Sequence, residues 1–164
     1  MVDRPALDEL YTASYRRLVV QLYAICGDLA DAEDAVQEGF VAVLRKHRQM
    51  ARVENPEAWV RTTALHHLHS RWRHGAVVRK YQPRVPGPQP PTEIGPEYVA
   101  IVTALAQIDA GQREVVVLHY LADLGTADIA DQLGIPEGTV KSRLARARER
   151  LAGLLEDKEG QRNV

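Results

Sequence analysis

The sequence predicts an all-α protein made of two small helical domains, and three observations support this fold class. Apolar residues recur at steps of three and four along most of the chain, which is typical of helices with one buried face. No useful length of sequence alternates as a half-buried strand does. Six prolines gather between positions 83 and 96, so we expect a domain over residues 1–81, a Pro-rich linker over 82–97 and a second domain over 98–164.

Three helices are predicted in the first domain. An apolar stripe predicts the first over residues 7–26, and Gly27 should end it. Asp31 is predicted to cap the second helix, because an aspartate there accepts a hydrogen bond from one of the first free amides. The predicted buried side of this second helix consists of Ala32, Val36, Phe40, Val43 and Leu44.

Residues 47–54 are predicted to form a loop, because their periodicity is weak. Asn55 and Pro56 are typical of a helix start, with asparagine as the cap and proline in the first turn. We therefore expect the third helix over residues 56–73. Its core-facing residues are predicted to be Ala64, Leu65, Leu68 and Trp72.

The second domain is predicted to hold four helices, the first two over residues 98–108 and 112–121. Ile101, Leu105 and Ile108 share one side of the first. Gly125 or Thr126 should cap the third helix, and the charged tail from residue 156 onward is expected to fray.

Residues 126–150 have the pattern of a helix-turn-helix. Gly134 suits the turn, where a positive φ is cheap for glycine, and Pro136 is tolerated where the second helix starts. Five cationic residues and one acid then fall between positions 141 and 150. This combination predicts a second helix that enters the major groove of DNA.

The net charge is −1, but acidic and basic residues are concentrated in different segments of the chain. Residues 28–38 hold five acids and no base, whereas 45–52 hold four Arg or Lys residues and no acid. The single cysteine, Cys26, excludes an internal disulfide. The sequence shows no run long enough to span a membrane and no signal-peptide pattern, so a cytoplasmic protein is expected.

Two segments carry a resemblance to a known family. Residues 31–40, Asp-Ala-Glu-Asp-Ala-Val-Gln-Glu-Gly-Phe, resemble the second conserved region of bacterial sigma factors. Residues 137–148, Glu-Gly-Thr-Val-Lys-Ser-Arg-Leu-Ala-Arg-Ala-Arg, resemble their fourth region. Their order and spacing are similar to those of group IV, or extracytoplasmic-function (ECF), sigma factors of the sigma-70 superfamily, which keep only these two regions.

This resemblance implies a protein without cofactor or enzymatic activity that binds core RNA polymerase, recognises promoter DNA and supports its opening. The second region would dock on the clamp helices of the polymerase. The matching positions are Asp34, Gln37, Glu38 and Phe40. An acidic patch with one exposed aromatic suits a protein partner; helix-cap acids and a core phenylalanine are the alternative. An anti-sigma protein is a further partner that occurs in this group.

The resemblance also assigns contacts with the −10 element and the melted strand. Unpaired strands are held by cations and aromatic stacking. The residues concerned are Arg48, Arg52, Trp59, Arg61, His66, His69 and Arg73. The family commonly has asparagine at the position of His66, so the base preference cannot be transferred. A place in the core is the alternative for Trp59.

The −35 element would be read by the start of the last helix. Lys141, Ser142 and Arg146 match positions near bases or adjacent phosphates, and Thr139 and Arg143 match backbone contacts. Val140 and Leu144 should point inward. Arg148 and Arg150 are open to the alternative of a solvated helix face.

Other functions are compatible with parts of the sequence. A free-standing helix-turn-helix regulator would use only the last two helices and would have no need of the acidic one. A metal-dependent hydrolase would need more than His66 and His69, for which no third ligand is evident, so no metal site is predicted. A pure interaction protein is the remaining alternative.

Overall fold

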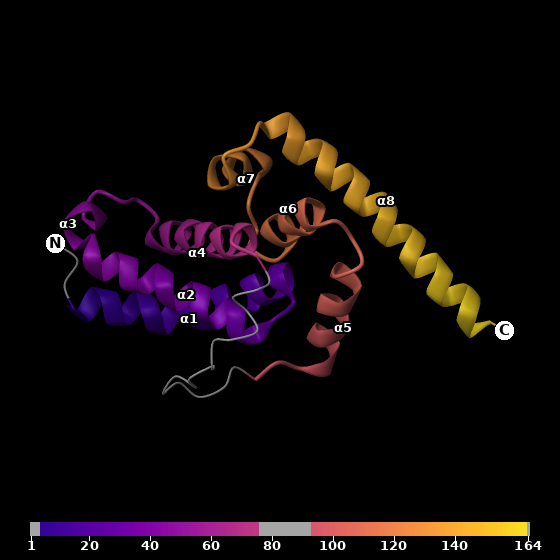
Figure 1. The fold of residues 1–164 in the computed structure, drawn as a ribbon, viewed down its shortest axis with the longest axis horizontal. Helices are drawn as coiled ribbons and strands as arrows, with labels where there is room; N and C mark the ends of the chain where they lie inside the picture. Colours follow the sequence, from indigo (N-terminus) through magenta and orange to yellow (C-terminus); the bar gives the residue numbers. More distant parts are fainter. Residues whose placement is uncertain (1–3, 76–92, 164) are drawn as a thin grey trace. The chain divides into compact units, whose positions relative to one another are not determined.

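The structure, a computed structural model, describes residues 4–75 and 93–163, and all regular secondary structure in these ranges is helical (Figure 1). The predicted all-α class is confirmed. Residues 82–92, most of the predicted linker, lie outside the described residues. The helices are α1 (Arg4–Cys26), α2 (Leu29–Arg45), α3 (His47–Met50), α4 (Pro56–Arg73), α5 (Pro96–Leu105), α6 (Ala110–Tyr120), α7 (Thr126–Leu133) and α8 (Glu137–Arg162).

The described chain separates into two compact units. Within it, the N-terminal unit comprises residues up to 22, 28–75, 93 and 94. The C-terminal unit comprises residues 23–27 and 95–163. Each unit has its own apolar core, as expected when a short chain forms two small domains.

The second helix begins earlier than predicted. Asp28, and not Asp31, is its cap: the Asp28 carboxylate accepts a hydrogen bond from the amide of Asp31 at 3.1 Å. The backbone reverses at Gly27, whose φ is +73°, so the helix can start two residues later. Asp31 therefore lies in the first turn, largely buried, where the partial positive charge of the helix end favours an acid.

The buried side of α2 matches the prediction except at its last position. Ala32, Val36, Phe40 and Val43 are buried, but Leu44 is 58% exposed because it lies at the edge of the stripe and near the end of the helix. The predicted loop over 47–54 also contains one helical turn, α3, which is held by the buried side chain of Met50.

Gly39 allows α2 and α4 to pack in close contact. A Cβ atom built on Gly39 would lie 2.9 Å from both the carbonyl oxygen and Cγ1 of Val60. Real Cβ atoms do not approach backbone oxygens so closely, so only glycine fits at this crossing. The two helices pack together along their length, and this contact builds the core of the N-terminal unit.

The third predicted helix has the expected bounds, 56–73, and Asn55 caps it by accepting from the Ala58 amide at 3.0 Å. Ala64, Leu65 and Leu68 are buried as predicted. Trp72 is only partly buried, which corrects its assignment to the core. On the inner side the buried polar residue is Arg61, whose Nε donates to Oε1 of Gln21 at 2.9 Å.

In the C-terminal unit α6, α7 and α8 pack on one another, and α5 contacts α8. The α5 helix starts at Pro96, two residues before the predicted position, with Gly95 as cap. Val102 and Leu105 face the core, but Ile101 is 46% exposed, so its place on the predicted buried side is wrong. The run Val115–Leu118 is helical and buried, because tertiary burial overrides its β-branched preference.

The helix-turn-helix is formed by α7 and α8. Gly125 caps α7 and Gly134 ends it with φ +65°, as expected from the sequence. Pro136 is the cap residue of α8, directly before its first residue. Ile129, Val140 and Leu144 are buried between the helices. The α8 helix continues to Arg162, so the prediction that it frays from residue 156 is wrong.

Replacing Arg61 should destabilise the N-terminal unit. Arg61→Ala leaves the buried Gln21 side chain without its partner, and we expect a loss of about 2–4 kcal/mol in the free energy of unfolding. Both tryptophans of the chain lie in this unit, so urea unfolding followed by tryptophan fluorescence measures the change. The control is Arg17→Ala, which removes an ion pair between the exposed Arg17 and the partly exposed Glu57 and should cost less than about 1 kcal/mol. Equal losses in the two variants would contradict this account.

Gly39→Ala should separate α2 from α4, since the added methyl group meets backbone and not a movable side chain. We expect a loss of about 1–3 kcal/mol in the stability of the N-terminal unit, measured in the same urea titration. Gly153→Ala is the matched control within a helix: nothing lies within 4 Å of its Cβ position and it lies in the C-terminal unit, so the tryptophan-detected unfolding of the N-terminal unit should be unchanged. If Gly39→Ala left the stability of the N-terminal unit unchanged, α2 and α4 would be able to move apart without cost, which would contradict this account.

Candidate functional site

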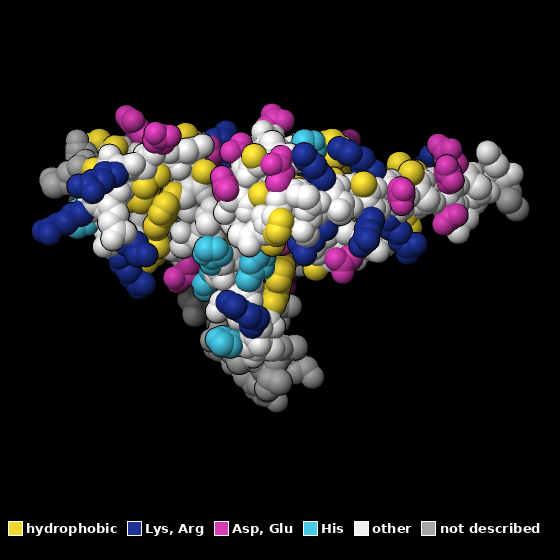
Figure 2. Space-filling model, turned by 90° about the horizontal axis from the view of Figure 1, so that it is seen from above, with side chains coloured by type: hydrophobic (Ala, Val, Ile, Leu, Met, Phe, Trp, Pro, Cys, Tyr) yellow, Lys and Arg dark blue, Asp and Glu magenta, His cyan; other side chains and the backbone are white. Residues whose placement is uncertain are grey.

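The exposed side of α8 combines small and cationic residues. Val140, Leu144 and Ala147 face the core of the C-terminal unit, as predicted for the first two. Lys141, Ser142 and Arg146 are exposed, and Thr139 and Arg143 are partly exposed. Figure 2 shows Lys and Arg side chains along the first half of α8 and acidic ones near its end. All five residues predicted to contact the −35 element are thus at least partly accessible on one helix.

A hydrogen bond joins the starts of α7 and α8. The Thr126 hydroxyl donates to Oε1 of Glu137 at 2.7 Å, and Nζ of Lys141 lies 3.6 Å from the same oxygen. The Thr126 hydroxyl and then the Lys141 ammonium hold the pKa of Glu137 below its ordinary value. Lys141 keeps a largely exposed side chain in this pair, so its ammonium is still accessible to another anion.

Arg143 lies against the start of α6. A Cβ atom built on Gly111 would lie 3.2 Å from Cζ of Arg143 and 3.4 Å from Oδ2 of Asp109. Arg146 lines a neighbouring hollow of about 530 Å³ that includes Gln112 and Arg150. The turn before α6 and one flank of α8 therefore form a common surface, which sequence reasoning on α8 alone did not include.

Arg148 lies on the other flank of α8. Its Nε donates to the hydroxyl of Tyr120 at 2.7 Å, and its Cζ lies 5.7 Å from the centre of the Tyr120 ring. Arg148 thus has an intramolecular partner at the end of α6, which fits the alternative of a structural and solvated position.

The acidic helix α2 has a different arrangement from the one expected. Oδ2 of Asp34 accepts from Arg71 at 2.7 Å and lies 3.3 Å from Nε2 of His67, so this acid is tied to α4. The Tyr15 hydroxyl has a hydrogen bond with Gln37. Glu38 is exposed, and no ion pair or hydrogen bond of its side chain is found in the described part of the chain.

Phe40 is not the exposed aromatic that the sequence suggested. It is 5% exposed, and its ring lies 4.9 Å from that of Tyr11 and 6.4 Å from that of Tyr15. A residue this deeply packed against α1 is part of the core. The resemblance was therefore a poor guide here, because the apolar stripe of α2 already includes position 40.

The cationic segment after α2 adjoins a pocket on α4. Arg45, Lys46, Arg48 and Arg52 are exposed, and Figure 2 shows basic side chains grouped at this end of the N-terminal unit. A pocket of about 410 Å³ lies beside them. Its walls include Lys46, Val53, Asn55, Trp59, Thr62, Thr63 and His66. Trp59 is partly exposed and not a buried core residue. Thr62 and Thr63 follow Trp59 by three and four residues, a spacing that could have identified them.

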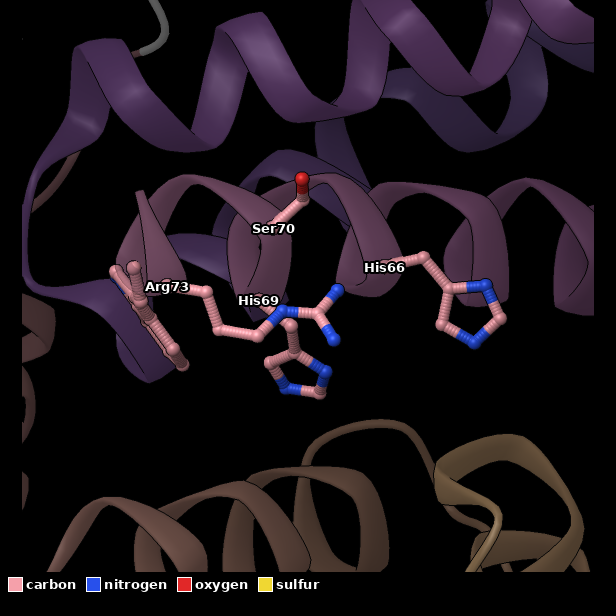
Figure 3. A pocket seen from close by; sticks show the side chains of 5 residues that line it. His66, His69, Ser70 and Arg73 are labelled. Carbon is pink, nitrogen blue, oxygen red and sulfur yellow. The ribbon is translucent and has the colours of Figure 1, made fainter. Parts of the chain in front are cut away.

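The outer face of α4 continues past this pocket. His66, His69, Ser70, Trp72 and Arg73 line a second hollow, and Figure 3 shows His66, His69 and Arg73 projecting from the same side of the helix. His66 lines both hollows. Arg61 is the exception among the predicted residues, because it lies on the opposite, buried face and binds Gln21.

No group of three or more His, Cys, Asp or Glu side chains in the described part of the chain is arranged to hold a metal ion. Among the described helices, none combines the length and the apolar character needed to cross a membrane.

Comparison with known proteins identifies the family. The chain matches the sigma-70 region 2 family over residues 10–76 and the sigma-70 region 4 family over residues 98–151. It is 35% identical to the ECF RNA polymerase sigma factor SigL of Mycobacterium tuberculosis over 128 residues, which cover 73% of this chain and 72% of SigL. It is 33% identical to SigM of the same organism, over 93% of this chain and 79% of SigM.

A solved structure agrees with these relatives. The sigma factor RpoE of Bartonella quintana, determined in complex with the anti-sigma factor NepR, matches with a TM-score of 0.73 at 25% identity. The match covers 91% of this chain and 96% of RpoE. With both conserved regions present in order, and with relatives above 30% identity over most of their length, this chain belongs to the extracytoplasmic-function sigma factors of RNA polymerase.

Proposed function

We propose that this sigma factor binds core RNA polymerase and the two promoter elements through three separate surfaces, each on its own helices. The exposed part of α2 binds core RNA polymerase, the outer face of α3 and α4 holds the opened −10 strand, and the first half of α8 reads the −35 element. The observation that carries this proposal is the separation of chemistry: Glu38 on α2, for which the described residues offer no partner, cations beside tryptophans on α3–α4, and exposed cations on α8. The corresponding domains are residues 1–81 and 98–164.

The −35 contact is supported by the accessible side of α8. Small side chains at Gly138, Ser142 and Ala145 allow the helix backbone to come close to base edges in the major groove. Lys141 flanks them on one side, and Arg143 and Arg146 flank them on the other. Lysine and arginine pair with guanine acceptors or with phosphates, so the flanks supply affinity and register.

Ser142 has a narrower role on this surface. Its hydroxyl donates to the carbonyl oxygen of Gly138 at 3.0 Å, which leaves its lone pairs as the free groups. In this state Ser142 accepts a hydrogen bond, and the major-groove donors are the amino groups of adenine and cytosine. We therefore propose that Ser142 faces one of these two bases.

The −10 contact is supported by the pocket beside Trp59. The ring of Trp59 offers a stacking surface, and Lys46, Arg48 and Arg52 supply positive charge for phosphates. Thr62 and Thr63 donate their hydroxyl protons to the carbonyls of Ala58 and Trp59, so their oxygens act as acceptors toward a base. His66 completes the pocket, and Arg61 has no place in it.

Core binding is assigned to the exposed side of α2. Glu38 is free to meet a basic partner, whereas Asp34 is shared with Arg71 and His67. We propose that Glu38 contacts the clamp helices directly, and that Asp34 contributes both to this surface and to the packing of α2 on α4. Phe40 supports the surface from the core.

We also propose that the protein acts in the cytoplasm, where transcription takes place, as an initiation factor and not as an enzyme. Control by an anti-sigma protein is a further part of the proposal. It is supported by the match to RpoE over nearly its whole length, since that sigma factor was solved with NepR bound. The overall proposal is tested by mixing purified chain with core polymerase: a stoichiometric complex and promoter-specific transcripts are expected. Failure to bind the core would refute it.

Removing two cations from α8 should weaken −35 recognition. Lys141→Ala with Arg146→Ala takes away two exposed charges without touching Val140, Leu144 or Ala147, and each contact is worth about 1–3 kcal/mol. We expect at least roughly tenfold less transcription from a promoter that depends on its −35 element, with core binding unchanged. Arg162→Ala removes a single positive charge from the far end of α8 and should have no effect. A loss of core binding in the double variant would contradict the assignment.

Charge reversal on α2 should weaken core binding without unfolding the unit. Glu38→Lys should lower the affinity for core polymerase by roughly tenfold or more, because a charge facing a complementary surface is inverted. Fluorescence anisotropy of the labelled chain measures the affinity. The control is Glu9→Lys, which makes the same charge change at an exposed position of α1. Asp34→Ala should also reduce stability, since it removes one of the two acids that pair with Arg71. Unchanged core affinity in Glu38→Lys would exclude this surface.

A further inference from the structure

We propose that Trp72 and His69 form a second stacking site for unpaired DNA, so that α4 holds the strand at two points. This inference rests on the proposed function and extends it, because the sequence assigned Trp72 to the core. The rings of His69 and Trp72 have centroids 5.5 Å apart with planes tilted by 44°, within the range of interacting aromatic pairs. Both side chains are partly exposed and line the hollow of Figure 3.

The surroundings of this pair fit a nucleotide. His66 and Arg73 line the same hollow, and in the described part of the chain neither side chain forms a hydrogen bond or an ion pair. Arg71, by contrast, is turned to α2 and neutralised by Asp34 and Asp31. The outer face of α4 therefore presents an aromatic pair beside an unneutralised guanidinium. Single strands are held by this combination: bases stack on rings, and phosphates pair with cations.

The two hollows lie in series along one helix. Trp59 and Trp72 are thirteen residues apart, which is about 20 Å at the rise of an α-helix. His66 lies between them and lines both hollows. A strand that enters the pocket of Trp59 can therefore continue past His66 to Trp72 and Arg73. The site would take a run of unpaired nucleotides with little base preference at Trp72, since every base offers a stacking face.

Intrinsic tryptophan fluorescence can report on binding at Trp59 and at Trp72 separately. The chain has two tryptophans, so Trp59→Phe leaves Trp72 as the only emitter and Trp72→Phe leaves Trp59. Titration of the full-length variants with a short oligothymidylate should quench both emitters, and a duplex of the same length should not. Quenching of Trp59 alone would overturn the second site and leave the proposed function standing. If neither emitter responds, the proposed strand binding by α4 fails as well.

A functional assay then tests whether the second site is used. Polymerase carrying Trp72→Leu should open promoter DNA roughly tenfold less, measured as permanganate reactivity of unpaired thymines, because one stacked base is lost. Trp72→Phe should restore opening because it keeps a ring on which a base can stack, and core and −35 binding should be unchanged in both variants. Tyr120→Leu removes an exposed aromatic from the C-terminal unit, and polymerase carrying it should open DNA normally. Normal opening by Trp72→Leu would overturn the inference. If that variant does not fold, the fluorescence result with Trp59→Phe decides.

Discussion

The close crossing of α2 and α4 is the constraint on which the N-terminal unit depends. Gly39 brings the α2 backbone to within contact distance of Val60, and burial of Val36, Ala64 and Leu68 follows from that approach. The ion pair of Asp34 with Arg71 joins α2 to α4, and the hydrogen bond of Arg61 with Gln21 joins α4 to α1, so polar contacts add direction to packing that apolar contacts alone would leave free to rotate. The outer face of α4 and the exposed side of α2 are thus positioned by one helix pair, so the surfaces proposed for strand binding and for polymerase binding share one structural support.

The C-terminal unit differs from the N-terminal unit in that α8, the helix proposed to read DNA, keeps most of its surface accessible. Only Val140, Leu144 and Ala147 of the first half of α8 are buried. The starts of α7 and α8 are tied together by Thr126 and Glu137, and the turn before α6 lies beside Arg143. Few apolar contacts and several polar ones at the edges leave most cations on the solvent side. Because polymerase binding supplies the rest of the affinity, this helix does not need the strongly basic surface of a protein that binds DNA alone.

Local patterns predicted most of the fold. The 3.6-residue periodicity, Asn55 before Pro56, and glycines at positions 27 and 134 depend on short-range physics, and the structure follows them. The wrong predictions concern long-range partners or the ends of elements. Asp31 has the chemistry of a cap, but Gly27 lets the helix begin before it. Phe40 and Arg61 were given surface roles by resemblance, although the α2 stripe already pointed to burial for one. The partner of the other, Gln21, is forty residues away, beyond any local pattern.

The contrast between local patterns and long-range partners also applies to the candidate sites. Which residues share a helix face follows from spacing: His66, His69 and Arg73, at steps of three and four, project from one side of α4. Which cations stay unpaired does not follow from spacing, because it depends on whether the neighbouring helix places an acid beside them. Arg71 and Arg73 are two residues apart on the same helix, yet α2 neutralises the first and leaves the second open. Packing between helices therefore decides which members of a basic and aromatic segment can meet DNA, and it places the available cation beside Trp72.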